Sequence, residues 1–134
     1  MEEKNIDIQK IKAHWISRSE SDYKTMLHLY KAKDYHWALF MGHLVIERLL
    51  KALIISKTET HPPFTHDLRR LAGLSAIKLS EKQKKELDTV TTFNLNARYD
   101  DYKEKFYQKC TPEYTEEWIT NIKALRKWIK EKLQ

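Results

Sequence analysis

The stretch NARYDDYKEKF, residues 96–106, places an arginine and two tyrosines beside two adjacent acids. Arg98 can make bidentate contacts with a phosphate, and the ring of Tyr99 offers a face on which a base can stack. The two acids that follow could neutralise the arginine or cap a turn. Two interpretations stay open: a ligand site, or a structural pair in which Arg98 bridges acids such as Glu47 or Asp22 while Tyr99 packs under a loop.

Histidine is the other residue type that could supply chemistry. His61 and His66 flank the loop that contains Pro62 and Pro63. Two histidines without an accompanying array of carboxylates are a weak metal signal, so we predict no metal and no cofactor. His66, followed by Asp67, is better interpreted as a hydrogen-bonding joint between this loop and a neighbouring helix.

Nucleophilic and phosphate-loop chemistry have little support. Cys110 is the only cysteine, which excludes an intramolecular disulfide and a CxxC motif. It comes just before an expected helix cap, a position that can lower a thiol pKa, but no histidine follows His66 in the sequence. The two glycines are isolated and cannot form a phosphate-cradling loop.

The length of 134 residues and the net charge of +6 bound the class of protein. We expect one domain over residues 1–134, with attraction to acidic partners such as nucleotides or nucleic acid. The start of the chain lacks the apolar core of a signal peptide, and no apolar run reaches the ~20 residues that cross a bilayer. We therefore predict a cytoplasmic protein that does not associate with membranes.

The elements that position these residues are predicted to be long helices, because the chain has only 2 glycines and 3 prolines. Apolar spacing predicts a first helix over residues 7–32 and a second over residues 35–56. The second is apolar nearly all round and belongs at the centre of a bundle or at a subunit interface. Gly42 indicates a close approach of another helix, and Asp22, near the apolar stripe of the first helix, needs a polar partner.

Cap and turn signals bound the next helices. Asp34 is the expected cap of the second helix. The Pro-Pro pair ends that helix, and Thr65 is expected to cap a short third helix over residues 66–74. Ser80 and Gln83 match a capping box, which predicts that a fourth helix begins there.

Thr111 as cap and Pro112 at the first helical position mark the start of the last helix. Its C-terminal half is rich in lysine and arginine, and cations there are stabilised by the helix dipole. This cluster of charges therefore has a structural explanation that does not require a bound phosphate. Between the fourth and last helices, residues 96–106 interrupt the helical pattern. The predicted fold class is all-α, an up-and-down antiparallel bundle of four to five helices.

Taken together, the stretches YKAKDYHWALFMGHLVIERLLKALI, PPFTHDLRRL and NARYDDY resemble the HEPN domain family, the higher eukaryote and prokaryote nucleotide-binding domain. That family has an acid-bearing first helix, then an aromatic-rich second helix ending in Glu-x-x-x-Lys-Ala, a Thr-His-Asp-Leu turn and an Ala-Arg-Tyr element. These features fall in the same order on Asp22, on Glu47, Lys51 and Ala52, on residues 65–68 and on residues 97–99. One departure is His43-Leu44, where many relatives carry glutamines.

The resemblance, to the small prokaryotic stand-alone type, implies a helical bundle that usually forms a homodimer. Many members are encoded beside a minimal nucleotidyltransferase, some are toxins of toxin–antitoxin pairs, and others bind nucleotides or cut RNA without a metal. The RNA-cutting members carry Arg-x(4–6)-His, because that chemistry needs a cation for the phosphate and an imidazole for proton transfer. No arginine of this sequence has a histidine at that spacing.

We therefore lean away from an enzyme and predict a non-catalytic HEPN-type module that binds a nucleotide, RNA or a partner protein. The partner expected from the resemblance is a minimal nucleotidyltransferase. In this hypothesis the ligand site of the dimer comprises Arg98, Tyr99, Lys51 and His66, and a polar network comprises Asp22, Glu47 and Asp67. The alternatives are a metal-independent RNase toxin with a divergent site and a purely structural dimer.

Overall fold

The computed structural model describes residues 7–134, in which every regular element is an α-helix. The six helices are α1 (Ile8–Lys31), α2 (Tyr35–Thr58), α3 (Leu68–Leu74), α4 (Glu81–Arg98), α5 (Asp100–Lys109) and α6 (Pro112–Lys132). The predicted all-helical bundle is confirmed, but the predicted four to five helices are too few.

The helix missed by the sequence pattern is α5. A single extended residue, Tyr99 (φ −99°, ψ 129°), ends α4 and begins α5. Neither glycine nor proline is needed, because the extended conformation is open to any residue. Asp100 and Asp101 occupy the first turn of α5, where negative charge is stabilised by the helix dipole. The apparent interruption at residues 96–106 is therefore a bend between two helices.

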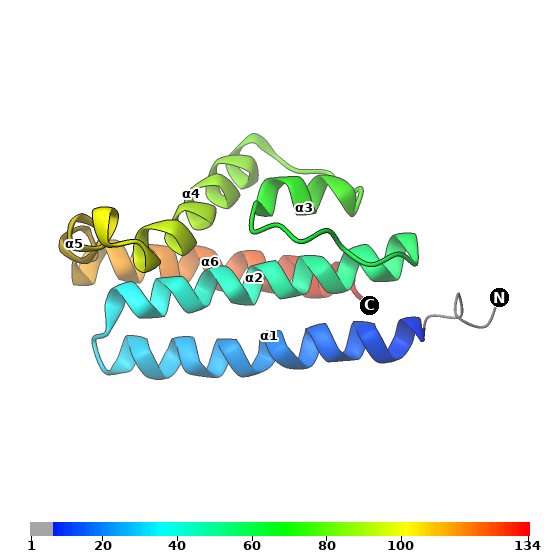
Figure 1. Cartoon of the computed structure of the whole chain (residues 1–134), viewed down its shortest axis with the longest axis horizontal. Coiled ribbons are helices and arrows are strands. Elements are labelled where there is room, and N and C mark those ends of the chain that lie inside the picture. Colours follow the sequence, from blue (N-terminus) through cyan, green and yellow to red (C-terminus); the bar gives the residue numbers. More distant parts are fainter. Residues whose placement is uncertain (1–6) are drawn as a thin grey trace.

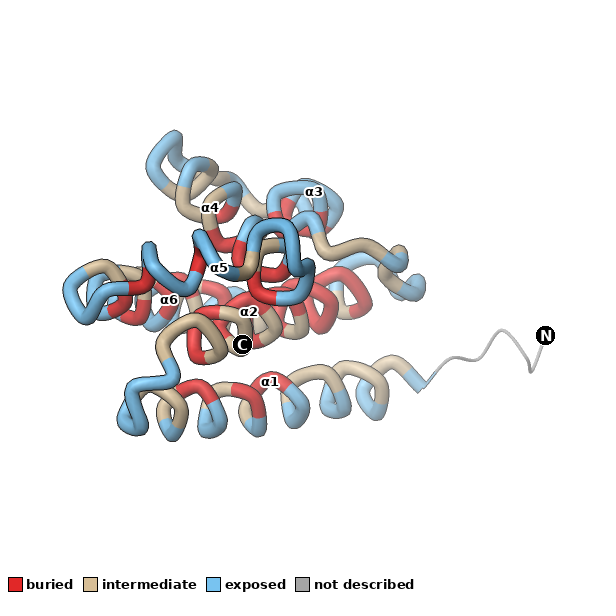
Figure 2. The backbone as a smooth tube through the Cα atoms, turned by 60° about the vertical axis from the view of Figure 1, so that its left-hand side comes forward, coloured by how far each residue is buried: buried red, intermediate tan, exposed pale blue. Residues whose placement is uncertain are grey.

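The second helix, α2, is the centre of the bundle and packs against each of the other helices in residues 7–134. It forms an antiparallel hairpin with α1, while α6 lies along its other side and α3 and α4 cross above (Figure 1). The buried residues concentrate on α2, and α1 is buried only along the side that faces it (Figure 2). This position agrees with the apolar circumference of α2.

Gly42 lies on α2 where side chains of α6 and α1 pack close to its backbone. A methyl group added at Gly42 would lie 2.5 Å from Cδ1 of Ile122 and 3.3 Å from Sδ of Met26. These distances are shorter than ordinary van der Waals contact between such atoms, so the absence of a side chain allows the two helices to approach. The predicted close approach at this glycine is confirmed.

The helix starts agree with the sequence in two cases. Ser80 accepts a hydrogen bond from the backbone N–H of Gln83, whose side chain accepts one from the backbone N–H of Ser80, so the capping box is complete. Thr111 caps α6 by accepting from the backbone N–H of Tyr114, with Pro112 at the first helical position.

Two other cap predictions are wrong. Asp34 occupies the cap position of α2, but its side chain makes no capping hydrogen bond. The third helix begins at Leu68 and is capped by Asp67, which accepts from the backbone N–H of Arg70. Thr65 instead accepts a hydrogen bond from the backbone N–H of Asp67, in a turn before the helix. His66 lies outside the helix, and its side chain bonds to Glu47 of α2.

None of the helices within residues 7–134 is both long enough and apolar enough to cross a membrane.

Candidate functional site

The first candidate site is a group of polar side chains along one side of α2. His43, Glu47 and Lys51 follow at four-residue intervals, which places them on one face of the helix, and all three are buried. Glu47 Oε2 accepts a hydrogen bond of 2.9 Å from Lys51 Nζ, and Glu47 Oε1 accepts one of 2.8 Å from His66 Nδ1. We call Glu47, Lys51, His43 and His66, with Asn94 from α4, the Glu47 cluster.

His43 connects the Glu47 cluster to the loop before α3 and to α4. Its Nε2 donates to the backbone carbonyl of His66 at 2.9 Å, which leaves Nδ1 as the acceptor in the neutral ring. Asn94 Nδ2 lies 3.4 Å from that Nδ1 and can donate to it. Burial lowers the pKa of His43 below its ordinary value, so the neutral ring is the favoured form in the folded protein.

The charge on Glu47 is retained inside the bundle. Burial by itself would raise the pKa of this carboxyl, but the hydrogen bonds from His66 and Lys51, together with the charge interactions with His43 and Lys51, lower the pKa overall. A carboxylate buried to 5% exposure is tolerated because two donors satisfy it. Lys51 is held further by Trp15 of α1, whose ring centroid lies 5.2 Å from Nζ.

Asp22 forms a second polar link between α1 and α2. Its carboxylate pairs with the guanidinium of Arg48, and nearby Ser19 donates to the backbone carbonyl of Val45 at 2.8 Å. Burial raises the pKa of Asp22, and the attraction of Arg48 only partly opposes this. Asp22 and Glu47 thus each have their own cationic partner within the bundle.

The predicted ligand residues Lys51 and His66 therefore meet in the structure at Glu47. The Lys51 side chain is almost fully enclosed, whereas that of His66 is 41% exposed. Through Trp15, His66 and Asn94, the cluster connects α2 to α1, to the loop before α3 and to α4. Such connections stabilise the packing of the bundle. The assignment of Lys51 and His66 to a ligand site stays a prediction.

The second candidate site is the corner between α4 and α5, where Arg98 and Tyr99 lie. Both are exposed, Tyr99 to 50%, and the Arg98 guanidinium carbon is 5.4 Å from the centre of the Tyr99 ring. Within residues 7–134 no ion pair joins Arg98 to an acid. The interpretation in which Arg98 bridges Glu47 or Asp22 is wrong, because other cations pair with both acids.

The structure does not bring this corner together with the Glu47 cluster. No hydrogen bond, ion pair or aromatic contact in the described part of the chain links Arg98 or Tyr99 to Lys51 or His66. Asn94 belongs to the cluster and lies one helical turn before Arg98, so α4 carries both sites on successive turns. Arg98 and Tyr99 can offer a cation and an aromatic face to an external ligand, which the buried lysine cannot.

Further residues with similar chemistry lie on α5 and were not predicted from the sequence. A recess of about 220 Å³ is lined by Asn96, Tyr102, Lys105, Phe106 and Lys109. The spacing of Tyr102, Lys105 and Lys109 is that of one helix face, so the signal was present. It could be used only once residues 100–109 were recognised as a helix.

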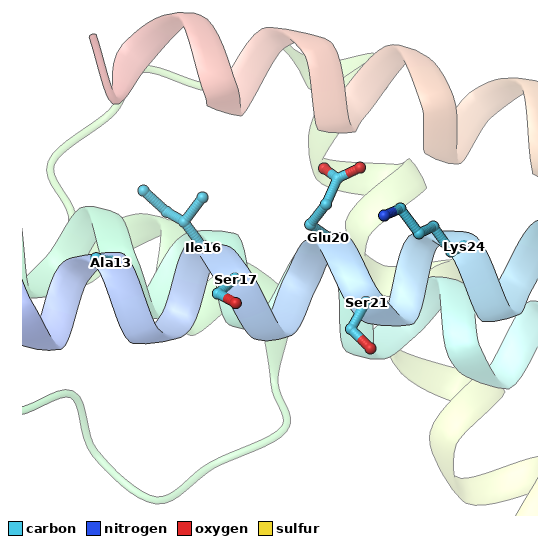
Figure 3. Close-up of a pocket in the computed structure, with 6 residues that line it drawn as sticks. All are labelled: Ala13, Ile16, Ser17, Glu20, Ser21 and Lys24. Carbon is cyan, nitrogen blue, oxygen red and sulfur yellow. The ribbon is translucent and has the colours of Figure 1, made fainter.

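A larger groove of about 560 Å³ lies on α1, on the side that faces α6, and is lined by Ala13, Ile16, Ser17, Glu20, Ser21 and Lys24. Glu20 points from α1 toward α6 (Figure 3), where its carboxylate accepts a 2.8 Å hydrogen bond from Arg126. This pairing spans the two helices. None of the residues predicted to bind a ligand lines the groove.

Comparisons with known proteins agree with this architecture. The crystal structure of TT1696 from Thermus thermophilus shares the fold, with a TM-score of 0.77 at 16% sequence identity. The match covers 90% of this chain and 97% of that one. No curated protein gives a significant match. The family model described as the HEPN domain matches residues 13–133, and the chain therefore belongs to the HEPN domain family.

Proposed function

We propose that this HEPN protein is a non-catalytic module that binds a nucleotide or another phosphate-bearing ligand through Arg98 and Tyr99. Membership of the family indicates a function related to nucleotides or RNA. The binding partner that we favour is a minimal nucleotidyltransferase on another chain, in a two-component, toxin–antitoxin-like system. The module would act as a homodimer in the cytoplasm.

The observation that carries this proposal is the contrast in how the cations are used. Lys51, Arg48 and Arg126 each pair with a carboxylate of the bundle. Arg98 is exposed, and no acid within residues 7–134 pairs with it, while an exposed aromatic ring lies beside it. An exposed guanidinium next to a ring can bind a phosphate and stack a base without breaking an existing ion pair.

A non-catalytic role is supported by the positions of the histidines. The RNA-cutting members of the family use an imidazole close to the phosphate-binding cation for proton transfer. His43 is buried and bonded to the His66 carbonyl, and the His66 ring is bonded to Glu47. Within residues 7–134, neither imidazole forms a hydrogen bond or a cation–π pair with Arg98.

Isothermal titration with ATP and with GTP tests the ligand. Binding is expected in the wild-type protein, and Arg98→Ala is expected to weaken it at least tenfold. Arg98→Lys should recover only part of the affinity, because lysine keeps the charge but loses the bidentate geometry. The matched control is Arg69→Ala, since Arg69 is also an exposed arginine but pairs with Asp88 at 3.0 Å.

Absence of binding at millimolar nucleotide would overturn the ligand half of the proposal. Incubation of the purified protein with RNA in the presence of a chelator addresses the rival function. Intact RNA agrees with a binding module, whereas degradation that disappears in His66→Ala would establish a metal-independent RNase. Co-purification with a minimal nucleotidyltransferase tests the proposed partner. Light scattering measures the mass of the free protein and tests the proposed homodimer.

A further inference from the structure

The groove on α1 that faces α6 takes no part in either candidate site. It holds about 560 Å³, and Ala13, Ser17 and Ser21 follow at four-residue intervals along it. Their short side chains leave the surface of α1 within reach of a second chain. Ile16, which is half-buried, gives the groove an apolar wall.

Cations surround this groove. Lys24 lines it and points from α1 toward α6, as Glu20 does (Figure 3). Glu20 is the acid among the lining residues, but Arg126 of α6 donates to it at 2.8 Å. Lys130, also of α6, has its Nζ 3.9 Å from the same carboxylate. The positive charges at the groove therefore outweigh its acid.

The exposed side of α6 next to the groove adds further positive charge. Lys123 and Lys127 precede Lys130 by seven and three residues, which places all three on one side of the helix. Both are exposed, and no acid within residues 7–134 pairs with them or with Lys24. Glu131, an exposed acid four residues after Lys127, offsets this excess only in part. The groove is thus an apolar recess with a basic rim.

These observations select among the macromolecules that a basic surface attracts. A second copy of this chain would bring the same lysines to the groove, and like charges repel. A membrane surface is bound by apolar side chains that insert among the lipids. The large exposed apolar side chains of the described chain all lie between residues 64 and 107, outside α1 and α6. A nucleic acid would leave the apolar wall unused and would find no aromatic ring in the groove on which to stack a base.

We propose that this groove binds an acidic amphipathic helix of a partner protein. An apolar side chain of that helix packs in the recess against Ile16, and carboxylates on either side of it pair with Lys24 and Lys127. The buried apolar contact holds the partner, while the basic rim selects its charge and orientation. This inference goes beyond the proposed function, because the corner between α4 and α5 takes no part in it.

Fluorescence anisotropy of labelled synthetic peptides with the full chain tests the proposal. The groove from Ala13 to Lys24 extends about 17 Å along α1, so a helical peptide of about 14 residues covers it. The acidic peptide carries leucines along one helix face and glutamates on both sides of that face. One control scrambles the same residues so that no apolar face forms, and another replaces each glutamate by lysine. The acidic peptide should bind roughly tenfold more tightly than either control, because only it offers both the apolar anchor and the acids.

Variants of the groove show which side chains bind the peptide. Lys24→Glu should weaken binding of the acidic peptide about tenfold and strengthen binding of the lysine peptide, because it reverses one charge of the rim. Ser17→Trp should abolish binding by filling the recess without changing any charge, and Ser17 is exposed, so the fold is kept. The matched control is Lys78→Glu, since Lys78 is exposed, lies before α4 and does not line the groove. It should leave both affinities nearly unchanged. Circular dichroism and melting curves ensure that each variant is folded.

Each outcome decides for or against the proposal. Equal binding of the acidic and scrambled peptides, unaffected by Ser17→Trp, overturns it and leaves only attraction by the net charge. No binding of the acidic peptide overturns it as well. Phosphatidylglycerol vesicles or an RNA duplex that bind through Lys24 when the acidic peptide does not would overturn it in favour of a membrane or a nucleic acid. None of these results affects the titrations with ATP and GTP, so the proposed function is tested separately.

Discussion

The Glu47 cluster and the α4–α5 corner use the same kinds of side chain for opposite purposes. In the cluster, a lysine and a histidine share one buried carboxylate, and contacts with Trp15 and Asn94 extend the joint to four segments of the chain. At the corner, an arginine and a tyrosine lie beside each other and are exposed. Residue type alone therefore does not separate a binding group from a structural one. Burial and the presence of a partner do.

The largest expected effect comes from breaking the cluster at its centre. Glu47→Ala removes the acceptor of both Lys51 and His66 and leaves an uncompensated lysine inside the bundle. The free energy of unfolding should fall by about 3–5 kcal/mol, as is usual when one member of a buried pair is removed. Urea denaturation measures this.

The matched control for Glu47→Ala is Asp88→Ala, which breaks the half-exposed pair with Arg69 and should leave stability nearly unchanged. If both substitutions cost the same, the Glu47 cluster is not the joint described above.

A smaller effect is expected for Lys51→Met, which keeps the volume of the side chain but removes one of the two donors to Glu47. The carboxylate keeps its bond to His66, so the loss should be about 1–3 kcal/mol. Nucleotide affinity of the folded protein should not change. A marked loss of affinity would place the buried cluster within the ligand site, as the sequence pattern predicts.

The cluster should also make the stability of the fold sensitive to acid. The pKa of His43 is lowered from 6.5 by burial, so the unfolded chain takes up this proton first and stability falls as the pH drops below 6.5. The pKa of Glu47 is lowered from 4.5, so its contribution is present above 4.5 and is lost as the pH falls further.

His43→Gln separates these two contributions. A glutamine side chain can donate to the His66 carbonyl and accept from Asn94 but does not titrate. Melting temperatures between pH 7 and pH 5 should decline less in the variant than in the wild type. Identical curves would mean that another group controls stability in this range.

The smallest effect on stability is expected at the corner. Arg98→Ala removes an exposed side chain that no acid of residues 7–134 pairs with, so the free energy of unfolding should change by less than about 0.5 kcal/mol. Differential scanning calorimetry gives the change in stability of this variant, and the titration described above gives its change in nucleotide affinity. A substantial drop in stability would make Arg98 a structural residue and remove the contrast between the two regions.

Local chemistry is enough to predict much of the fold. The Ser80–Gln83 box and the Thr111–Pro112 start depend on neighbouring residues alone, and the structure has both. The small volume of Gly42 also indicates the approach of another helix, though not that α6 supplies it. The assignment of a cap to Thr65 is wrong because Asp67, two residues later, offers the same capping chemistry in a better position.

The candidate site is less predictable, because its contacts join residues far apart in the sequence. The pairing of Asp22 with Arg48 and of Glu47 with His66 depends on how helices pack, which no local pattern specifies. The predicted ligand residues Arg98 and Lys51 are both cations, and only their surroundings distinguish them. No glycine or proline marks the bend at Tyr99, so the sequence does not show that a new helix begins there. Without that helix, the recess on α5 could not be predicted.

That bend leaves α5 attached to α4 through one extended residue, whose N–H caps the end of α4 and whose carbonyl accepts from the first turn of α5. A modest rotation about the φ and ψ of Tyr99 would swing the following ten residues as a unit while α4 stays in place. The packing of Phe106 on Phe93 opposes this rotation and fixes the angle between α5 and α4. Substitutions at these two phenylalanines can therefore re-aim Tyr102 and the lysines without altering a single residue that contributes a cation or a stacking ring.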